Sequence, residues 1–455
     1  MRDTSASLSE SGLVNLDEQR IDIYPGNPRY WSYKGSPVLL LGGSDEDNLF
    51  NHPDLLRANM KTLPACGGNY IRSTLSSRDP GNVWAYAKTG VSYDLERFNP
   101  EYWDRLRVCL EECYRLDIIV QIEVWATFDF YRENWPLNPF NPAINVNYTT
   151  ENTHLVEEWD HHPARKRQPF FFSPEALNND TVLLPYQEAF VIQVLDVSLE
   201  FPNVLYCIDN ETLAPPEWPL RWGRFIRDEA AKRGKNVHIT EMWNPWDLRE
   251  PEHAVTYSNP DVFSFTEVAQ NNWQQGETHY ERLIWYRENL LANGGPRPMN
   301  NVKVYGRERP REPRIASLNV DRFWKNVFAG CASSRFHRPD SGLGLNETAQ
   351  KMVRAARNFT SAFDIFSAEP RNDLLTDREE DEAYCLANPG DFHAVYFPDG
   401  GDITVDVGAG KGGHEVRWMD VDNATFHPSE RVAGPAVRLK TPAPGGVQLA
   451  LVKPS

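Results

Sequence analysis

The chain lacks several features that would place it in a common class of protein. Its six cysteines form no C-x-x-C pair, so they suggest small buried side chains rather than a disulfide framework or a metal site. No apolar run is long enough to cross a membrane. No GxGxxG or GxxxxGK[ST] motif follows an apolar run, which disfavours a nucleotide-binding sheet.

Positive charge is also scarce. The chain has 47 Lys and Arg against 64 Asp and Glu, for a formal net charge of −17. Nucleic acids and anionic membranes attract basic surfaces, so we expect neither as a partner. The composition leaves the oligomeric state open.

The beginning of the chain has no apolar stretch of the kind found in signal peptides. Together with the unpaired cysteines, this favours the cytoplasm. A periplasmic or secreted protein is the alternative, if a signal sequence has been removed.

Short apolar runs alternate with amphipathic segments from about residue 38 to residue 335. The runs that we expect to be strands are 38–41, 70–73, 118–124, 204–208, 237–240, 262–265, 302–305 and 328–333. Repeated strand–helix units indicate an α/β fold with a parallel sheet. Eight units predict a closed (β/α)8, or TIM, barrel, and an open doubly wound sheet is the main alternative.

The pattern of apolar and turn-forming residues changes after residue 364. Short apolar runs there are separated by Asn-Pro-Gly, Pro-Asp-Gly-Gly and Lys-Gly-Gly, which is typical of an antiparallel β-sandwich. We therefore expect a lead-in and hairpin over 1–34, a catalytic barrel over 35–364 and a smaller sandwich over 365–455. The connection 126–182 is long and aromatic, and we expect it to wall a cleft at the barrel mouth.

Carboxylates follow several of the predicted barrel strands. Asn210 and Glu211 follow the fourth, while Glu123, Glu241 and Glu267 end the third, fifth and sixth. The carboxyl ends of barrel strands carry the chemistry of TIM-barrel enzymes. Any one of these acids can merely bind a neighbour, but burying so many acids costs desolvation energy. Their number therefore predicts an active site.

The same segments resemble a known group of enzymes. The stretch GNYIR over 68–72 and the Asn210-Glu211 pair resemble the large clan of retaining glycoside hydrolases built on TIM barrels. A closer resemblance joins residues 27–31 and 35–44 to the opening of the apiosidase-like family of bacterial glycosidases. Residues 372–375, 394–401 and 416–418 resemble the β-domain of such enzymes that is called collagen-binding.

The resemblance implies hydrolysis of a glycosidic bond in a polysaccharide or its oligosaccharide side chains, with retention and no cofactor or metal. The long connection 126–182 favours a pocket over an open groove, and therefore exo-action or removal of side chains. Glu211 would be the acid/base, its pKa raised by burial and an anionic neighbour. Glu308, near the end of strand seven, would be the nucleophile. Glu308 lies between two Arg residues, however, and Thr212 stands where relatives carry Pro. Glu241 or Glu267 is therefore an alternative second carboxylate, with inversion.

Further residues are candidates for binding a sugar. Trp and Tyr rings suit stacking on sugars, and Arg, Asn, His and acids suit sugar hydroxyls. The candidates are Arg72, Asn210, Asp45, Trp125, Trp135, Glu241, Trp243, Glu267 and His337.

Three other functions stay open on the sequence alone. The first is a carbohydrate-binding barrel that does no chemistry. The second is a metal-dependent hydrolase or isomerase that uses His161, His162 or His238 with strand-end acids. The third is a polysaccharide lyase.

Overall fold

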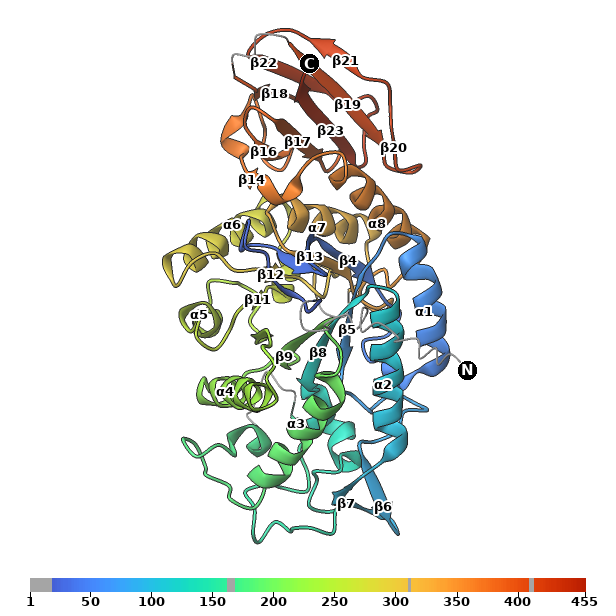
Figure 1. Cartoon of the computed structure of the whole chain (residues 1–455), viewed down its shortest axis with the longest axis vertical. Helices are drawn as coiled ribbons and strands as arrows, with labels where there is room; N and C mark the ends of the chain where they lie inside the picture. Colours follow the sequence, from blue (N-terminus) through green and yellow to red (C-terminus); the bar gives the residue numbers. More distant parts are fainter. Residues whose placement is uncertain (1–18, 162–167, 310–311, 409–412) are drawn as a thin grey trace, which may run out of the picture.

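The computed structural model describes residues 19–161, 168–309, 312–408 and 413–455, and Figure 1 shows their arrangement. A ring of helices and strands, blue to orange in the figure, makes up most of the molecule. The C-terminal strands, in red, pack against one side of this ring.

Eight parallel strands form the centre of the ring. They are β4 (Leu40–Gly43), β5 (Tyr70–Thr74), β8 (Ile119–Trp125), β9 (Val204–Asp209), β10 (Ile239–Thr240), β11 (Thr266–Glu267), β12 (Met299–Asn300) and β13 (Ser333–Phe336). Six of them pair in the order β10-β9-β8-β5-β4-β13, and β11 pairs with β12. Ser264 N donates to Ile239 O at 3.1 Å and Arg335 N to Asn301 O at 3.0 Å. These two bonds close the circle, which confirms the (β/α)8 barrel.

Each barrel strand is followed by a helix on the outside. These helices are α1 (Pro53–Ala65), α2 (Pro100–Arg115), α3 (Leu184–Ser198), α4 (Glu217–Lys232), α5 (Pro251–Ser258), α6 (Gly276–Ala292), α7 (Ala316–Phe328) and α8 (Glu347–Thr360). In α2, Asn99 caps the first turn by accepting from Glu101 N at 3.2 Å. Leu106 and Leu110 are buried on its inner face. An antiparallel hairpin, β6 (Tyr86–Thr89) and β7 (Ser92–Phe98), precedes α2.

Three predicted strands lie elsewhere than expected. The run 302–305 follows β12 rather than forming it. The run 328–333 begins with the last residue of α7, passes through Gly330 at φ 75°, and enters β13 only at Ser333. The run 262–265 precedes β11 rather than forming it. A short apolar run looks the same whether it closes a helix or forms a buried strand, so periodicity cannot locate it.

A small N-terminal sheet closes the end of the barrel opposite the strand carboxyl ends. Its strands are β1 (Asp22–Ile23), β2 (Trp31–Tyr33) and β3 (Ser36–Val38). Trp31 Nε1 donates to Asn300 Oδ1 at 2.9 Å, and its ring lies 5.2 Å from that of Phe265. This sheet therefore plugs the base of the barrel.

The connection 126–182 folds into short 3-10 turns, η2 (Thr127–Phe130), η3 (Arg132–Leu137) and η4 (Pro169–Phe172). Phe130 packs against Phe170 with ring centroids 4.1 Å apart, and against Trp135 at 6.2 Å. Aromatic packing thus gives this loop a core of its own. Its residues Phe128, Glu133 and Asn134 line the main cavity of the barrel mouth, so the expected wall is confirmed.

The C-terminal strands form two antiparallel sheets. They are β14 (Glu369–Pro370), β15 (Leu375–Thr376), β16 (Tyr384–Asn388), β17 (Phe392–Phe397), β18 (Asp402–Asp406), β19 (His414–Asp420), β20 (Thr425–Phe426), β21 (Glu430–Val432), β22 (Ala436–Lys440) and β23 (Gln448–Pro454). The larger sheet follows β14-β16-β17-β23-β19-β20, with β21 on β19, and the smaller follows β15-β18-β22. Val395 and Phe397 of one share a core with Val405 and Val437 of the other, which confirms the sandwich.

Helix α7 carries several of the contacts that join the sandwich to the barrel. Tyr396 donates to Asp321 Oδ1 at 3.0 Å, and its ring stacks on Trp324 with centroids 6.1 Å apart. Lys325 pairs with Asp381 at 2.6 Å. Helices α6 and α8 add further contacts, because Arg287 pairs with Glu369 and the ring of Phe359 stacks on Phe426. Among the described residues, we find no helix with the length and apolarity needed to cross a bilayer.

Candidate functional site

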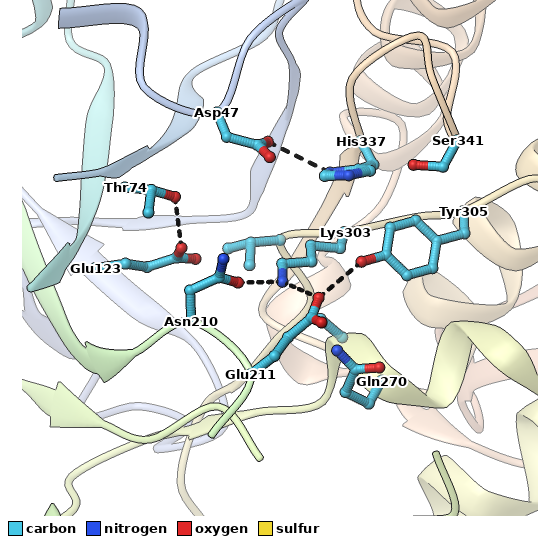
Figure 2. A network of polar contacts seen from close by, with 12 residues as sticks. Asp47, Thr74, Glu123, Asn210, Glu211, Gln270, Lys303, Tyr305, His337 and Ser341 are labelled. Carbon is cyan, nitrogen blue, oxygen red and sulfur yellow. Dashed lines mark hydrogen bonds and ion pairs between the residues drawn. The ribbon is translucent and has the colours of Figure 1, made fainter. Parts of the chain in front are cut away.

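A cavity of about 470 Å³ opens at the carboxyl ends of the barrel strands. It is lined by Asp47, Arg78, Asp79, Phe128, Glu133, Asn134, Asn210, Glu211, Trp273, Lys303, Tyr305, Arg307, His337, Arg338, Asp340 and Ser341. Figure 2 shows that Asp47 with His337, and Glu211 with Lys303 and Tyr305, lie on two sides of this polar centre. The position is the one where barrel enzymes place their chemistry.

Glu211 directs its carboxylate into this cavity. Its backbone adopts a φ of 63°, a left-handed conformation that a non-glycine residue rarely holds unless the surroundings impose it. Lys303 Nζ donates to Glu211 Oε1, and Tyr305 donates its hydroxyl hydrogen to the same oxygen at 3.0 Å. The side chain remains 15% exposed, so a ligand in the cavity can reach it.

These partners hold Glu211 in its charged form. Burial alone would raise its pKa, but the Lys303 ammonium and the hydrogen bonds from Lys303 and Tyr305 outweigh burial and lower the pKa below its ordinary value. The expectation that burial and an anionic neighbour raise this pKa is therefore wrong. The dominant neighbour is a cation.

The seventh strand supplies this cation. Residues 302–305 continue β12, and Val304 pairs with Phe336 of β13. Lys303 and Tyr305 are two residues apart, so both side chains point to the same side of an extended chain. Lys303 Nζ also donates to Asn210 Oδ1. Where the resemblance implies a strand-seven carboxylate, the structure places a lysine.

Glu308 lies beyond this segment. It is exposed in the loop after β12 and does not line the cavity. Its charge acts on Arg322 of α7. The structure therefore does not bring Glu308 together with Glu211, and its role as nucleophile stays a prediction from the resemblance.

Across the cavity, Asp47 lies beside two arginines and a histidine. It lies 3.5 Å from Arg72 Nη1, 3.4 Å from His337 Nδ1 and 3.7 Å from Arg338 Nε. Burial would raise its pKa, but the guanidinium groups of Arg72 and Arg338 bring the pKa well below the ordinary value. Burial lowers the pKa of His337 well below 6.5. This wall therefore offers an ionised carboxylate beside a neutral imidazole.

Arg72 lies beneath the cavity, and its side chain is fully buried. Its Nη2 donates to Glu123 Oε2 at 2.7 Å and to Thr74 Oγ1 at 2.7 Å. Arg72 thus ties Asp47 to Glu123 rather than lining the cavity itself.

The other strand-end acids are enclosed in the barrel wall. Glu241 Oε1 accepts from Met242 N at 2.7 Å and Asp209 N at 3.1 Å, and Glu267 Oε2 accepts from Gln121 at 3.0 Å. Burial, with Asp209 as an anionic neighbour, raises the pKa of Glu241 well above its ordinary value. Burial raises the pKa of Glu267 to about 8. Neither acid lines the cavity.

The three predicted stacking tryptophans are core residues. Trp125 stacks on Phe190 with centroids 5.1 Å apart, beside an internal apolar space of about 30 Å³. Trp135 Nε1 donates to Val156 O at 2.8 Å, and Trp243 Nε1 donates to Thr256 Oγ1 at 2.8 Å. All three are buried, so the structure does not bring them to the cavity.

Asp45 also lies away from the cavity. It is exposed and accepts from Leu345 N at 2.9 Å. It fastens the start of the first βα connection to the loop before α8, which is a structural contact.

The two described histidines among those proposed for a metal, His161 and His238, do not share a site. His161 is exposed beside Trp159, His238 pairs with Asp22 at 3.0 Å, and His162 lies outside the described residues. In the described part of the chain, the group with metal-ligand geometry is Glu46, His52 and Asp79, whose ligand atoms lie within 4.8 Å of one another. His52 Nε2 also contacts the Asn82 amide at 3.1 Å, so a hydrogen bond already uses one of the three groups.

Asn210, Glu211 and His337 are the sequence-predicted residues that the structure places at the cavity. Asp47, Lys303, Tyr305 and Trp273 join them there without having been predicted. The i, i+2 spacing of Lys303 and Tyr305 at the end of strand seven is the signal that would have located two of them.

No family model matches the chain, and no curated protein matches it either. The resemblance to the apiosidase-like family therefore stays a prediction, as does the collagen-binding label of the C-terminal domain. Solved structures do match. One described as a glycoside hydrolase has 13% identity and a TM-score of 0.65, covering 96% of this chain and 97% of its own.

A glycoside hydrolase family 5 structure from Bacteroides vulgatus has 14% identity and a TM-score of 0.66. The match covers 95% of this chain and 93% of that one. At these identities the likeness shows the fold: a TIM barrel that continues into a C-terminal β-domain.

Proposed function

We propose that the chain is a glycoside hydrolase whose barrel-mouth cavity binds a sugar and whose chemistry depends on Glu211. The observation that carries the proposal is the carboxylate of Glu211, held by Lys303 and Tyr305 in an open cavity. The likeness to solved glycoside hydrolases supports the same class of reaction.

In this proposal Glu211 acts as an ionised group. Cleavage of a glycosidic bond needs a carboxylate that stabilises or attacks the positively charged sugar carbon, and a separate proton donor for the leaving oxygen. Because its pKa is lowered, Glu211 suits the first role rather than that of acid. The His337 imidazole beside Asp47, on the opposite wall, is suited to accept a hydrogen bond from a sugar hydroxyl, and the leaving oxygen would take its proton from water in the open cavity.

The substrate class follows from the walls of the cavity. The 126–182 connection contributes Phe128, Glu133 and Asn134 and closes one side. A closed side favours removal of end groups or side chains from a glycan over cleavage in the middle of a long chain. Retention was predicted from a strand-seven carboxylate, and Lys303 at that place gives it no support.

A second candidate is a barrel that binds carbohydrate without cleaving it. The contact that favours it is the ion pair between Lys303 and Glu211, because it neutralises the one predicted catalytic acid that lies in the cavity. Polar groups that pair with one another in this way can still bind sugar hydroxyls.

A substrate screen separates the two candidates. The protein is incubated with pectic, algal, mannan and arabinogalactan-type glycans and with aryl glycosides, and released reducing sugar is measured. The proposal expects turnover of at least one substrate, with Glu211→Gln inactive on it. Binding without turnover would establish the second candidate, and turnover by Glu211→Gln at the wild-type rate would contradict the first.

A further inference from the structure

A row of rings leads from the catalytic cavity to the protein surface. His337 lies 4.7 Å from Tyr305, Tyr305 lies 5.0 Å from Trp273, and Trp273 stacks on Trp246 at 4.9 Å with an interplanar angle of 29°. His337, Tyr305 and Trp273 line the cavity, whereas Trp246 lies just outside it. The row thus continues the cavity wall outward.

Trp246 is unusual among the tryptophans of this protein. All fourteen lie in the described residues, and Trp246 is the one that is exposed, at 43%. A large exposed indole costs solvation free energy unless something covers it. An exposed ring that adjoins a sugar-binding cavity is therefore a candidate for a ligand contact.

The loop that carries Trp246 is held in place. Gln274 Nε2 donates to Trp246 O at 3.0 Å, and Trp273 Nε1 donates to Gln270 Oε1 at 3.2 Å. The next residue, Asp247, pairs with Arg282 at 2.9 Å and with Arg249 at 2.6 Å. The indole of Trp246 is thus presented on a fixed support, which reduces the entropy lost when a ligand stacks on it.

We propose that Trp246, backed by Trp273, is a stacking platform for a further sugar unit of a glycan whose reacting unit lies in the cavity. Sugar rings have an apolar face that packs on an indole, while their hydroxyls stay in water. The inference rests on the proposed function and adds to it that the natural substrate is an oligosaccharide or polysaccharide rather than a simple glycoside.

The test is native electrophoresis in gels that contain soluble β-mannan, xylan, arabinan or pectic galactan, one per gel. We expect at least one of them to retard the wild type. Trp246→Ala should bind that glycan about tenfold more weakly, while Trp246→Phe, which keeps a flat ring, should stay within about threefold of the wild type. Leu291→Ala removes an exposed apolar side chain of α6, outside the cavity lining, and should bind as the wild type does.

Kinetics separates this inference from the proposed function. Trp246→Ala should raise KM for the bound glycan and leave turnover of a short aryl glycoside unchanged. Equal glycan affinity in the wild type and Trp246→Ala, or no retardation in any gel, would overturn the platform. In either case, Glu211-dependent cleavage of the short glycoside would still support the hydrolase. If the wild type does not cleave the short glycoside, that result would instead count against the proposed function.

Discussion

Glu211 and Glu241 follow neighbouring parallel strands of the same barrel, β9 and β10, yet their chemistry is opposite. Glu241 is fully buried among backbone amides with Asp209 nearby, and its pKa is raised well above normal. Glu211 opens onto the cavity beside Lys303, and its pKa is lowered. The position of an acid at a strand end therefore predicts where the acid lies in the barrel. Its neighbours determine whether it is charged.

The same contrast extends around the barrel. Glu267 belongs to an interior network in which Gln121 links it to Tyr70, whose hydroxyl donates to Gln121 Oε1 at 2.6 Å. Asp47, at the mouth, faces Arg72 and His337. The pKa values of the interior acids Glu241 and Glu267 are therefore raised, whereas those of Glu211 and Asp47 at the mouth are lowered.

The largest difference in kcat should appear between two single variants that carry the same substitution, Glu211→Gln and Glu241→Gln. Glu211→Gln removes the ionised oxygen and should lower kcat about 10³-fold or more on a substrate from the screen. Glu241→Gln replaces a protonated acid with an amide of the same shape and should keep kcat within about threefold. Steady-state kinetics measures kcat of both variants. Equal losses of kcat would contradict the contrast between Glu211 and Glu241.

The next effect should come from removing the cation. Lys303→Met takes away the main charge that keeps Glu211 ionised, so the pKa of Glu211 should rise. The acidic limb of the kcat/KM profile against pH should then move to higher pH. Lys303→Arg keeps a cation and should leave the limb near its wild-type position. If the acidic limb lies at the same pH in Lys303→Met as in the wild type, a group other than Glu211 determines its position.

A smaller effect is expected on stability. The folded-state pKa of Glu267 is about 8 against an ordinary 4.5, so the folded protein holds a proton that the unfolded chain releases. This contribution is fully present below pH 4.5 and falls as pH rises toward 8, by at most about 1.4 kcal/mol per pH unit.

Glu267→Gln keeps the hydrogen-bonding shape without a titrating group. Its free energy of unfolding in urea should decline less than that of the wild type between pH 5 and pH 8. If both proteins decline equally, Glu267 is not the protonated interior acid described here.

The smallest effect is expected at Glu308. Because it is exposed and outside the cavity lining, Glu308→Gln should change kcat by less than about twofold. A loss as large as that of Glu211→Gln would restore it as the nucleophile predicted from the resemblance. Chemical rescue of Glu308→Ala by azide would confirm that reading.

The sequence predicted the barrel and the sandwich because both rest on spacing. Eight apolar runs with helices between them, and short runs separated by Gly-rich turns, leave few other folds. Predictions failed where the spacing of apolar residues does not distinguish a helix end from a strand. At residues 328–333, an apolar run ends α7 and only then enters a strand.

The site was predicted in part for a related reason. Position at a strand end located Asn210, Glu211 and His337 at the cavity, but it could not separate Glu211 from the enclosed Glu241. Aromatic residues form cores as readily as sugar platforms. Trp125, predicted as a platform, is therefore buried, while Trp246, which no strand end marks in the sequence, is exposed.

The most direct test of the central claim is the titration of Glu211 itself. Protein labelled with ¹³C at the glutamate side-chain carboxyls is titrated by NMR, with the Glu211 signal assigned as the one absent from Glu211→Gln. The account predicts a midpoint below the ordinary 4.5, rising in Lys303→Met. A midpoint above 4.5 in the wild type would contradict it, because Glu211 would then be the protonated acid rather than the ionised carboxylate of the cavity.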